Sequence, residues 1–323
     1  MTIRQRFRAY GEYLVIWTLS ATIPRMSRSG VLALARRWGN WSYSLARSLR
    51  VVGETNLRLA LGDALDDAGR ERILRSAFTN FILAILDTFW FARDSARRIA
   101  DWVVMDEVAF APLLRPAAQI CLTAHLGNWE VFGMAFSARG YPLTSVAAPF
   151  ENSSVDELFN TQRRRSGQRV ISKHGAIRQL LKTLRENGKI AMLLDQNTRL
   201  AAGGIFVPFF GLPVPVSSAA AMLWQRTGAE VYFGLCLPEP DGHYRVSPPT
   251  RIEIPQERNH PEAVVALTAA IARATEQAVR AHPGYWLWMY KRWKYIPEGA
   301  ARERFPFYAK PAVPARPAAR AAS

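Results

Sequence analysis

The spacing of apolar positions along this chain changes near residue 118. Before that point, apolar residues recur every three or four positions, which is the period of an α-helix. The pattern predicts helices over residues 30–50 and 70–91, and Asp66 and Asp67 are a plausible start signal for the second. Beyond residue 118, short apolar runs alternate with helical patterns, which is typical of an α/β fold. We therefore expect a mixed central sheet flanked by helices.

Four apolar runs in this second part have the length of strands, and helical patterns separate or follow them. The expected strands cover residues 119–124, 144–147, 189–194 and 230–237, and the expected helices cover residues 129–139, 154–166, 175–187, 217–227 and 262–281. Residues 244–247 and 251–254 form a candidate additional pair of strands.

The N-terminus combines basic and apolar positions. Three arginines within the first eight residues precede the apolar run Tyr13–Ile23, which is 11 residues long. Spanning a bilayer takes about 20 residues, so the run is too short to cross one. An interfacial or re-entrant helix with arginines at headgroup level fits this pattern. Two alternatives stay open: a signal-peptide core, although no small-x-small cleavage site follows before Arg25, and an ordinary core helix.

Composition narrows the class of partner. The chain has 42 basic and 26 acidic residues, a net charge of +16, which implies an anionic partner such as nucleic acid or acidic lipid headgroups. Ten Trp, ten Tyr and sixteen Phe favour a bilayer interface. The two cysteines, Cys121 and Cys236, lie in apolar runs without disulfide or metal-ligand spacing, which suits a reducing cytoplasm and predicts no metal site.

The sharpest chemical signal is the segment Thr-Ala-His-Leu-Gly-Asn-Trp-Glu, which ends at Glu130. A strand that ends just before His125 would deliver this side chain to the carboxyl edge of the sheet. Gly127 allows a tight turn, and Asn128 can cap the helix that follows. Glu130 then lies in the first helical turn and can fold back toward His125.

His125 and Glu130 are the residue types that acyl transfer to an alcohol requires. The reaction needs a base that takes the hydroxyl proton as the oxygen attacks a thioester. A neutral His serves if a carboxylate fixes its tautomer and stabilises the imidazolium that forms. The acceptor supplies the nucleophile, so no serine is needed. A structural His–Glu pair has the same spacing, and the spacing alone leaves both interpretations open.

Five blocks, in order, resemble the signature of the bacterial lipid A late acyltransferases, the lauroyl and myristoyl transferase family. They are His125-Leu-Gly-Asn-Trp-Glu130, the Arg-rich segment Asp156–Gly167, Leu193-Leu-Asp195-Gln196, Gly204-Ile-Phe-Val-Pro-Phe-Phe-Gly211 and Tyr285-Trp-Leu-Trp-Met-Tyr-Lys-Arg-Trp-Lys294. The resemblance covers about residues 57–299.

The resemblance implies an α/β fold with a membrane-associating N-terminal segment. Its donors are acyl carrier protein or coenzyme A thioesters, which act as co-substrates without a bound cofactor, and its acceptors are hydroxyls of glycolipids. It identifies His125 and Glu130 as the catalytic pair. The candidate substrate-binding residues are Asn128, Arg163, Arg164, Arg165, Asp195 and Gln196.

Two departures from the family pattern concern the acceptor headgroup. The family has an Arg-Pro pair on the strand after the catalytic helix, and here Ala148 stands in place of the arginine. Near the end, the family's Pro-(Glu/Gln)-Gln-Tyr becomes Pro283-Gly284-Tyr285, one residue shorter. Neither departure touches the His125–Glu130 pair.

Other groups of residues have two interpretations each. The Arg163–Arg165 cluster can bind phosphates, as arginine forks do, or form a solvated basic face. Phe206, Phe209 and Phe210 can line an acyl pocket or belong to the core. The aromatic residues of 285–294 fit an interfacial belt or a stacking surface for single-stranded nucleic acid. A nucleic-acid function leaves the histidine motif unexplained, and no nucleic-acid-binding motif is recognised.

We therefore expect an O-acyltransferase for a lipid A precursor in lipopolysaccharide biosynthesis, with a phosphatidylinositol mannoside, a lysophospholipid or another glycolipid as the alternative acceptor. Its partners would be the lipid acceptor, the thioester donor and an anionic membrane surface, with no nucleic acid. We expect peripheral or re-entrant attachment at the cytoplasmic face of the inner membrane. The expected units are a membrane-associating helical segment over 1–50, an acyltransferase domain over 51–308 and a disordered Pro/Ala-rich tail over 309–323.

Overall fold

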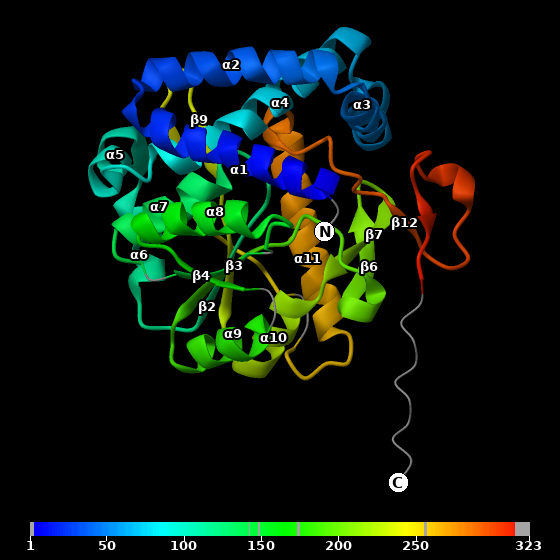
Figure 1. Cartoon of the computed structure of the whole chain (residues 1–323). Helices are drawn as coiled ribbons and strands as arrows, with labels where there is room; N and C mark the ends of the chain where they lie inside the picture. The colour runs from blue at the N-terminus through cyan, green and yellow to red at the C-terminus, as the bar shows by residue number, and fades with distance from the viewer. Residues whose placement is uncertain (1–2, 142, 148, 173–174, 255–256, 314–323) are drawn as a thin grey trace.

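A computed structural model describes residues 3–141, 143–147, 149–172, 175–254 and 257–313. Its centre is a six-stranded sheet with the strand order β11-β8-β2-β5-β3-β4. The strands are β2 (Gln119–Thr123), β3 (Leu143–Ala147), β4 (Arg169–Ser172), β5 (Lys189–Leu193), β8 (Glu230–Phe233) and β11 (Thr250–Arg251). All neighbours are parallel except β11, which is antiparallel to β8. The expected mixed central sheet flanked by helices is thus confirmed (Figure 1).

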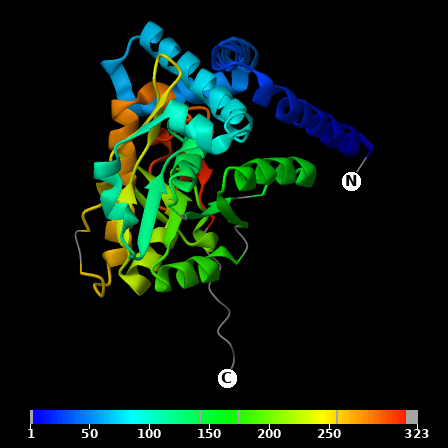
Figure 2. The same cartoon turned by 90° about the vertical axis from the view of Figure 1, so that its left-hand side faces the viewer.

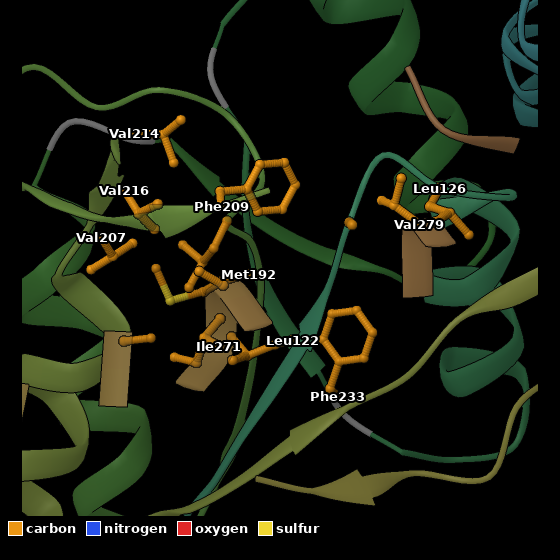
Figure 3. Packing of buried hydrophobic residues seen from close by; sticks show 14 of the residues in the cluster. Leu122, Leu126, Met192, Val207, Phe209, Val214, Val216, Phe233, Ile271 and Val279 are labelled. Carbon is orange, nitrogen blue, oxygen red and sulfur yellow. The ribbon is translucent and has the colours of Figure 1, made fainter. Parts of the chain in front are cut away.

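The β2 strand is buried on both of its faces, as expected for the centre of a parallel sheet. Ile120 and Leu122 belong to one buried cluster and Cys121 to another, because successive side chains point to opposite faces. In the first cluster, residues of the sheet pack against α11 (Ala263–Ala281) and the β6–β7 hairpin (Gly204–Phe209 and Leu212–Ser217). Figure 3 shows this packing around Leu122, Met192 and Ile271. In the second, α7 (Trp129–Ala138) covers the opposite face.

Smaller strand groups surround the main sheet. A three-stranded sheet contains β1 (Val103–Met105), β10 (Tyr244–Val246) and β9 (Cys236–Pro238), and a two-stranded sheet contains β12 (Tyr295–Ile296) and β13 (Lys310–Pro311). The expected single strand over 230–237 is therefore two strands in different sheets. The expected pairing of 244–247 with 251–254 is also wrong, because β10 joins β1 and β9 whereas β11 joins β8.

The expected tail is ordered at its start. Its residues Lys310 and Pro311 form β13 in register with Tyr295 and Ile296. Residues 314–323 of the tail lie outside the described residues, as does Ala148.

The first third of the chain is helical. It contains α1 (Ile3–Thr22), α2 (Arg28–Leu45), α3 (Arg47–Leu61), α4 (Asp67–Trp90), α5 (Ser95–Trp102) and α6 (Glu107–Leu114), with the short 3-10 turns η1 (Ile23–Arg25) and η2 (Gly62–Ala64). The expected helix over 30–50 is interrupted at Ala46, whose φ of −84° and ψ of 61° leave the helical region. The three-and-four spacing continues across this bend, so the apolar pattern alone conceals it.

The α4 helix is the central helix of this part of the protein. Its N-cap is Asp66, whose carboxylate accepts a hydrogen bond of 2.7 Å from the Gly69 N–H, so the start signal is confirmed. The α2 helix packs along it. From the sequence we expect no stretch beyond the N-terminal run to be able to cross a membrane, but among the described helices α4 is long and apolar enough to do so. Of its apolar window, 61% is buried within the protein, as in a core helix.

The α1 helix lies beside α8 (Ser153–Arg165), and its N-terminal end extends beyond the body of the molecule (Figure 2). Asn152 joins the two, because its amide donates 2.8 Å to the Ala9 carbonyl. The remaining helices are α9 (Ala176–Arg185) and α10 (Ala219–Thr227), with the 3-10 turns η3 (Leu200–Ala202), η4 (Pro283–Tyr285) and η5 (Arg302–Arg304).

Candidate active site

His125 and Asp195 meet because of the register between two neighbouring parallel strands. In that register, Thr123 of β2 pairs with Leu193 of β5. Each of the two side chains lies two residues beyond its paired strand residue, so both reach the carboxyl edge of the sheet at the same level. β2 and β5 are neighbours in the sheet although β3 and β4 lie between them in the chain. The strand order therefore reverses here, which is where open α/β sheets place ligands.

The Asp195 carboxylate is the direct partner of the His125 imidazole. His125 Nδ1 lies 2.7 Å from one carboxylate oxygen of Asp195, and the His125 backbone N–H donates to the other at 3.0 Å. The Trp286 indole N–H donates to that second oxygen, also at 3.0 Å. Asp195 is only 3% exposed, whereas the His125 side chain is 20% exposed. The carboxylate is therefore held from three sides and orients a ring that reaches solvent.

The electrostatic balance of the pair favours its charged form. Burial disfavours the imidazolium, but the Asp195 carboxylate with its hydrogen bond, and more weakly Glu130, outweigh burial and raise the pKa of His125. Burial likewise opposes the charge on Asp195, yet His125, the bond from Trp286 and the nearby Arg292 lower its pKa. An ionised Asp195 is thus available to bind Nδ1–H and leave Nε2 as the basic nitrogen.

Gln196 and Trp129 are the further neighbours of the His125 ring. The Gln196 amide nitrogen lies 3.5 Å from Nε2, a long contact from an exposed side chain. The Trp129 ring packs edge-on against the imidazole with 4.7 Å between ring centroids. The expected site residues Asp195 and Gln196 are therefore brought to His125.

The turn after His125 is fixed by backbone contacts. Gly127 has a φ of +69°, and a Cβ there would collide with the Cys236 carbonyl. The Gly127 N–H donates 3.1 Å to the Tyr285 carbonyl, and the Asn128 N–H donates 2.7 Å to that of Cys236. The Asn80 amide donates 2.8 Å to the Gly127 carbonyl. The sequence motif thus needs glycine because another segment lies against its backbone.

Glu130 faces Arg163 and not the His125 imidazole. The Arg163 guanidinium donates to both carboxylate oxygens of Glu130, from Nη2 at 2.6 Å and from Nε at 3.0 Å. Both side chains are nearly buried, 11% and 12% exposed. Burial opposes the guanidinium charge, but Glu130 outweighs it and raises the pKa of Arg163. The expectation that Glu130 folds back and fixes the tautomer of His125 is therefore wrong: α7 starts by directing Glu130 toward α8.

Asn128 is fully buried, which places its side chain away from any ligand. Its oxygen caps α7 by accepting 3.0 Å from the Val131 N–H, as the sequence pattern indicates. Its amide donates 2.9 Å to the Tyr244 hydroxyl and 3.2 Å to Asp87. Asp87 in turn pairs with the buried Arg28 of α2. The candidate substrate-binding role of Asn128 does not fit this arrangement, in which it anchors the turn.

The three consecutive arginines of α8 point in different directions. Arg163 holds Glu130, as described. Arg164 is exposed and pairs with Glu157 at 2.5 Å and with the Thr161 hydroxyl at 2.8 Å on its own helix. Arg165 lines a cavity beside the end of α1. They do not form one phosphate clamp, because successive helical side chains diverge by about 100°.

The aromatic block near the C-terminus is core. Trp286, Trp288 and Trp293 are at most 1% exposed, so the interfacial belt expected from their mixture with basic residues is wrong. Phe209 and Phe210 are likewise buried and pack edge-on against each other. Amphipathic composition misleads here because each indole N–H finds an acceptor within the fold. The acceptors are Asp195, the Pro283 carbonyl and the Phe209 carbonyl, respectively.

Sequence reasoning missed two residues that act on Asp195. Trp286 donates to it directly, and Arg292 contributes a nearby buried charge. Burial lowers the pKa of Arg292 to about 10, against the opposing effect of Asp195. Arg292 donates 2.9 Å to the Asn197 side chain. Both lie in a block that the sequence pattern singled out, but no spacing signal connects residues about 90 positions apart.

Metal-ligating side chains do not gather in the described part of the chain: no group of three His, Cys, Asp or Glu residues there is placed to hold a metal ion. Cys121 and Cys236 are buried and unpaired, and burial raises the pKa of the Cys121 thiol to about 12. Neither thiol is a nucleophile candidate.

Comparison with known proteins supports the family resemblance that the five sequence blocks indicate. The model of the bacterial lipid A biosynthesis acyltransferase family matches residues 4–295. A phosphatidylinositol mannoside acyltransferase of Mycolicibacterium smegmatis is 25% identical over 91% of this chain and 95% of its own. A lipid A biosynthesis lauroyltransferase of Escherichia coli is 24% identical over 79% of this chain and 82% of its own.

A phosphatidylinositol mannoside acyltransferase of Mycobacterium tuberculosis is 28% identical over 52% of this chain. The matched part spans about half the length of that relative, 52%. Since the family model covers most of the chain and includes the whole of the site, this protein belongs to the bacterial lipid A biosynthesis acyltransferase family.

Proposed function

We propose that this protein transfers a fatty acyl group from a thioester of acyl carrier protein or coenzyme A to a hydroxyl of a glycolipid. One observation carries the proposal: the His125 imidazole is bound at Nδ1 by a buried carboxylate, 2.7 Å away, and its side chain is 20% exposed. This is the arrangement that a general base for an alcohol requires. Family membership supports acyl transfer as the reaction.

In the proposed reaction, His125 Nε2 takes the proton of the acceptor hydroxyl while its oxygen attacks the thioester carbonyl carbon. The tetrahedral intermediate then collapses, the carbon–sulfur bond breaks, and the leaving thiolate takes the proton from the imidazolium. An ester and a free thiol result. Asp195 is a positioning residue, because it holds the ring in the Nδ1–H tautomer and stabilises the transient imidazolium.

We keep Glu130 in the proposed site with a changed role. It forms a bidentate pair with Arg163 and contributes to the electrostatic stabilisation of the His125 cation. We propose that the pair fixes α8 against the start of α7 and so maintains the wall of the acceptor site beside His125. Glu130 then acts through position and charge and not as the tautomer-fixing group.

For the acceptor, we propose a lipid A precursor, in lipopolysaccharide biosynthesis. A phosphatidylinositol mannoside is the second candidate, and the M. smegmatis relative, which aligns over 91% of the chain, favours it. Ala148 stands where the resemblance leads us to expect an arginine, which supports an acceptor preference different from that of ordinary lipid A enzymes. The net charge of +16 supports a phosphorylated acceptor in either case.

We propose peripheral attachment at the cytoplasmic face of the inner membrane. The α1 helix exposes Tyr10, Leu14 and Trp17, which recur at intervals of four and three residues and so share one face. Aromatic and aliphatic side chains on one face of a helix are suited to insertion at the level of the lipid headgroups.

The test compares His125→Ala and Asp195→Asn in detergent-solubilised protein, with acyl carrier protein and coenzyme A donors. We expect His125→Ala to lower the transfer rate by at least about 10³-fold and Asp195→Asn by roughly 10²–10⁴-fold, the range for general-base catalysis. His260→Ala, which changes an exposed histidine, is the matched control and should keep the wild-type rate.

The acceptor is tested in the same assay with lipid A precursors, phosphatidylinositol mannoside and lysophospholipid. Turnover by folded His125→Ala protein at the wild-type rate would falsify the general-base role. Product only on lysophospholipid would overturn the glycolipid acceptor and leave the acyl transfer chemistry in place.

A further inference from the structure

A cavity of about 410 Å³ lies where the C-terminal ends of α1, α4 and α8 approach one another. Three arginines line it: Arg25 from η1, Arg93 after α4, and Arg165 from α8. No acidic residue among those described lines it. Its volume falls in the range of small-molecule sites, roughly 300–1,000 Å³. The cavity therefore concentrates positive charge in a space large enough for a headgroup.

The charges of these arginines are weakly neutralised within the described part of the chain. Arg165 has no ion pair there, and Arg25 donates to the Ala21 carbonyl of its own turn. Arg93 lies 3.5 Å from Asp94, but both side chains are more than half exposed. Exposed pairs of this kind contribute little, so most of the positive potential remains available to an anion.

A side-chain amide also lines the cavity. Gln162 is 4% exposed, and its side chain forms no hydrogen bond with any described residue. Its amide is not among the fully buried polar atoms that lack a partner, so the amide reaches solvent in the cavity. The amide has N–H donors for a ligand oxygen. The three guanidinium groups that line the same cavity also have N–H donors.

The cavity wall is held by a fourth arginine. Arg98 donates 2.8 Å to the Pro24 carbonyl and also binds the Trp90 carbonyl, which ties η1 to the end of α4. Burial lowers the pKa of Arg98, and repulsion from Arg93 adds to the shift. The cavity wall is thus held in place beside a concentration of positive charge that Asp94 only partly offsets.

This cavity lies on the opposite side of α8 from the candidate active site. Arg163 and Arg165 are two residues apart, which corresponds to about 200° around a helix. Arg163 accordingly reaches Glu130 on α7, whereas Arg165 faces the end of α1. The α1 helix, whose Ser20 and Ala21 also line the cavity, exposes the stripe of Tyr10, Leu14 and Trp17.

We propose that the Arg25–Arg93–Arg165 cavity binds the phosphate of an anionic phospholipid headgroup at the membrane surface. A basic pocket at the end of a helix with an exposed apolar stripe matches a bilayer interface, where the stripe meets acyl chains and arginines meet phosphates. Arginine forks and the Gln162 amide supply donors for several phosphate oxygens. This site rests on the membrane attachment proposed above, and its test measures lipid binding and not acyl transfer.

The test is the partition of the full-length protein onto vesicles of phosphatidylglycerol with phosphatidylcholine. We expect the double variant Arg93→Ala/Arg165→Ala to bind them about tenfold to thirtyfold more weakly, since each basic residue near such a surface contributes about a factor of five. The control Arg178→Ala/Arg185→Ala removes equal charge from exposed positions of α9, away from α1 in Figure 1, and should change binding much less.

A second variant separates a built site from diffuse attraction. Gln162→Leu keeps the net charge and should still weaken vesicle binding severalfold, because it removes the amide donors. Equal losses in the two double variants, with no effect of Gln162→Leu, would overturn the proposal.

Two further arms identify the source of the phosphate. Inorganic phosphate could stabilise the wild-type protein and not Arg93→Ala/Arg165→Ala, while that variant still binds vesicles as wild type does. This result would make the cavity a site for free phosphate. If Arg93→Ala/Arg165→Ala instead has a raised KM for the acceptor and unchanged vesicle binding, the cavity is an acceptor site. Either result overturns the phospholipid assignment. His125→Ala protein should bind vesicles as wild type does, so loss of catalysis and loss of binding are read separately.

Discussion

The chemistry of the site depends on which carboxylate faces the His125 imidazole. Asp195 takes that position, at 2.7 Å, and Glu130 is engaged by Arg163. A buried carboxylate that accepts three N–H bonds is a strong orienting group, because its charge is little screened by solvent. The two acidic residues therefore have separable effects, which two sets of variants distinguish.

The first set concerns pH. A general base works only when neutral, so the raised pKa of His125 places the acid limb of kcat/KM above the ordinary histidine value of about 6.5. Replacing Asp195 with Asn removes the charge that raises this pKa. We expect the limb of Asp195→Asn to move to lower pH while its plateau rate falls. The measurement is a pH–rate profile of both proteins with saturating donor.

The sign of this shift is decisive. An acid limb that stays in place or moves to higher pH in Asp195→Asn would contradict the assignment of Asp195 as the partner of His125. His260→Ala should reproduce the wild-type profile, since this histidine is exposed and outside the site.

The second set is a double-mutant cycle on Glu130 and Arg163. Breaking a buried pair leaves an uncompensated charge, which typically costs about 3–5 kcal/mol of stability. Both side chains are 11–12% exposed, so we expect Glu130→Ala and Arg163→Ala each to lower Tm, and the double variant to lower it by less than their sum. Transfer rates should fall roughly 10²-fold or more in each single variant. Additive losses in Tm would show that the two residues act independently.

At the scale of elements, α1 is the part of the chain suited to contact lipid. Leu14 and Trp17 are 47% and 50% exposed on the same face of the helix as Tyr10. We expect Leu14→Gln/Trp17→Gln to move much of the protein from the membrane to the soluble fraction, because burying apolar side chains in the interface drives binding. Fractionation of cells at low and high salt is the measurement.

Val108→Gln is the control for this experiment, since Val108 is 84% exposed on α6 and outside the α1 stripe. If the double variant still binds the membrane, α1 is not the main anchor. The α2–α3 region, where Trp41, Leu45 and Leu49 are exposed, is then the better candidate. A simple truncation of residues 1–28 is less informative, because it also removes the buried partner of Asp87.

At the scale of the whole molecule, a buried network joins the N-terminal helices to the turn that follows His125. Arg28 of α2 pairs with Asp87 of α4, and Asp87 accepts from Asn128 at the turn and from the Tyr244 hydroxyl at 2.6 Å. Arg28 also donates 2.9 Å to the Gly242 carbonyl. The turn that positions His125 therefore depends on a segment nearly 100 residues earlier.

This network predicts a global effect from a distant substitution. Arg28→Met leaves Asp87 buried without its cation, and we expect Tm to fall by on the order of 10 °C, from a cost of about 3–5 kcal/mol. The residual folded protein should also transfer acyl groups more slowly. Thermal unfolding followed by circular dichroism is the measurement. Arg36→Met, which changes an exposed arginine of the same helix, should leave Tm within about 2 °C of wild type; equal Tm values for the two variants would refute the role of the network.

The sequence by itself determined the local features of this protein. The apolar periods located the central strands and most helices, because burial on one face of a helix or on both faces of a strand leaves a repeat in the chain. The strand–turn–helix motif located His125 at a sheet edge, and the ordered blocks indicated the family. Both depend on residues that are close in the chain or matched in order.

Only the tertiary structure decided which of these residues meet. Asp195 faces His125 because β5 inserts beside β2, and strand order is not encoded in the period of either strand. Trp286 belongs to the site and not to a membrane belt because its indole finds a buried carboxylate 91 residues earlier in the chain. Partners so far apart are chosen by the packing of whole elements, so their pairing appears only when the chain is folded.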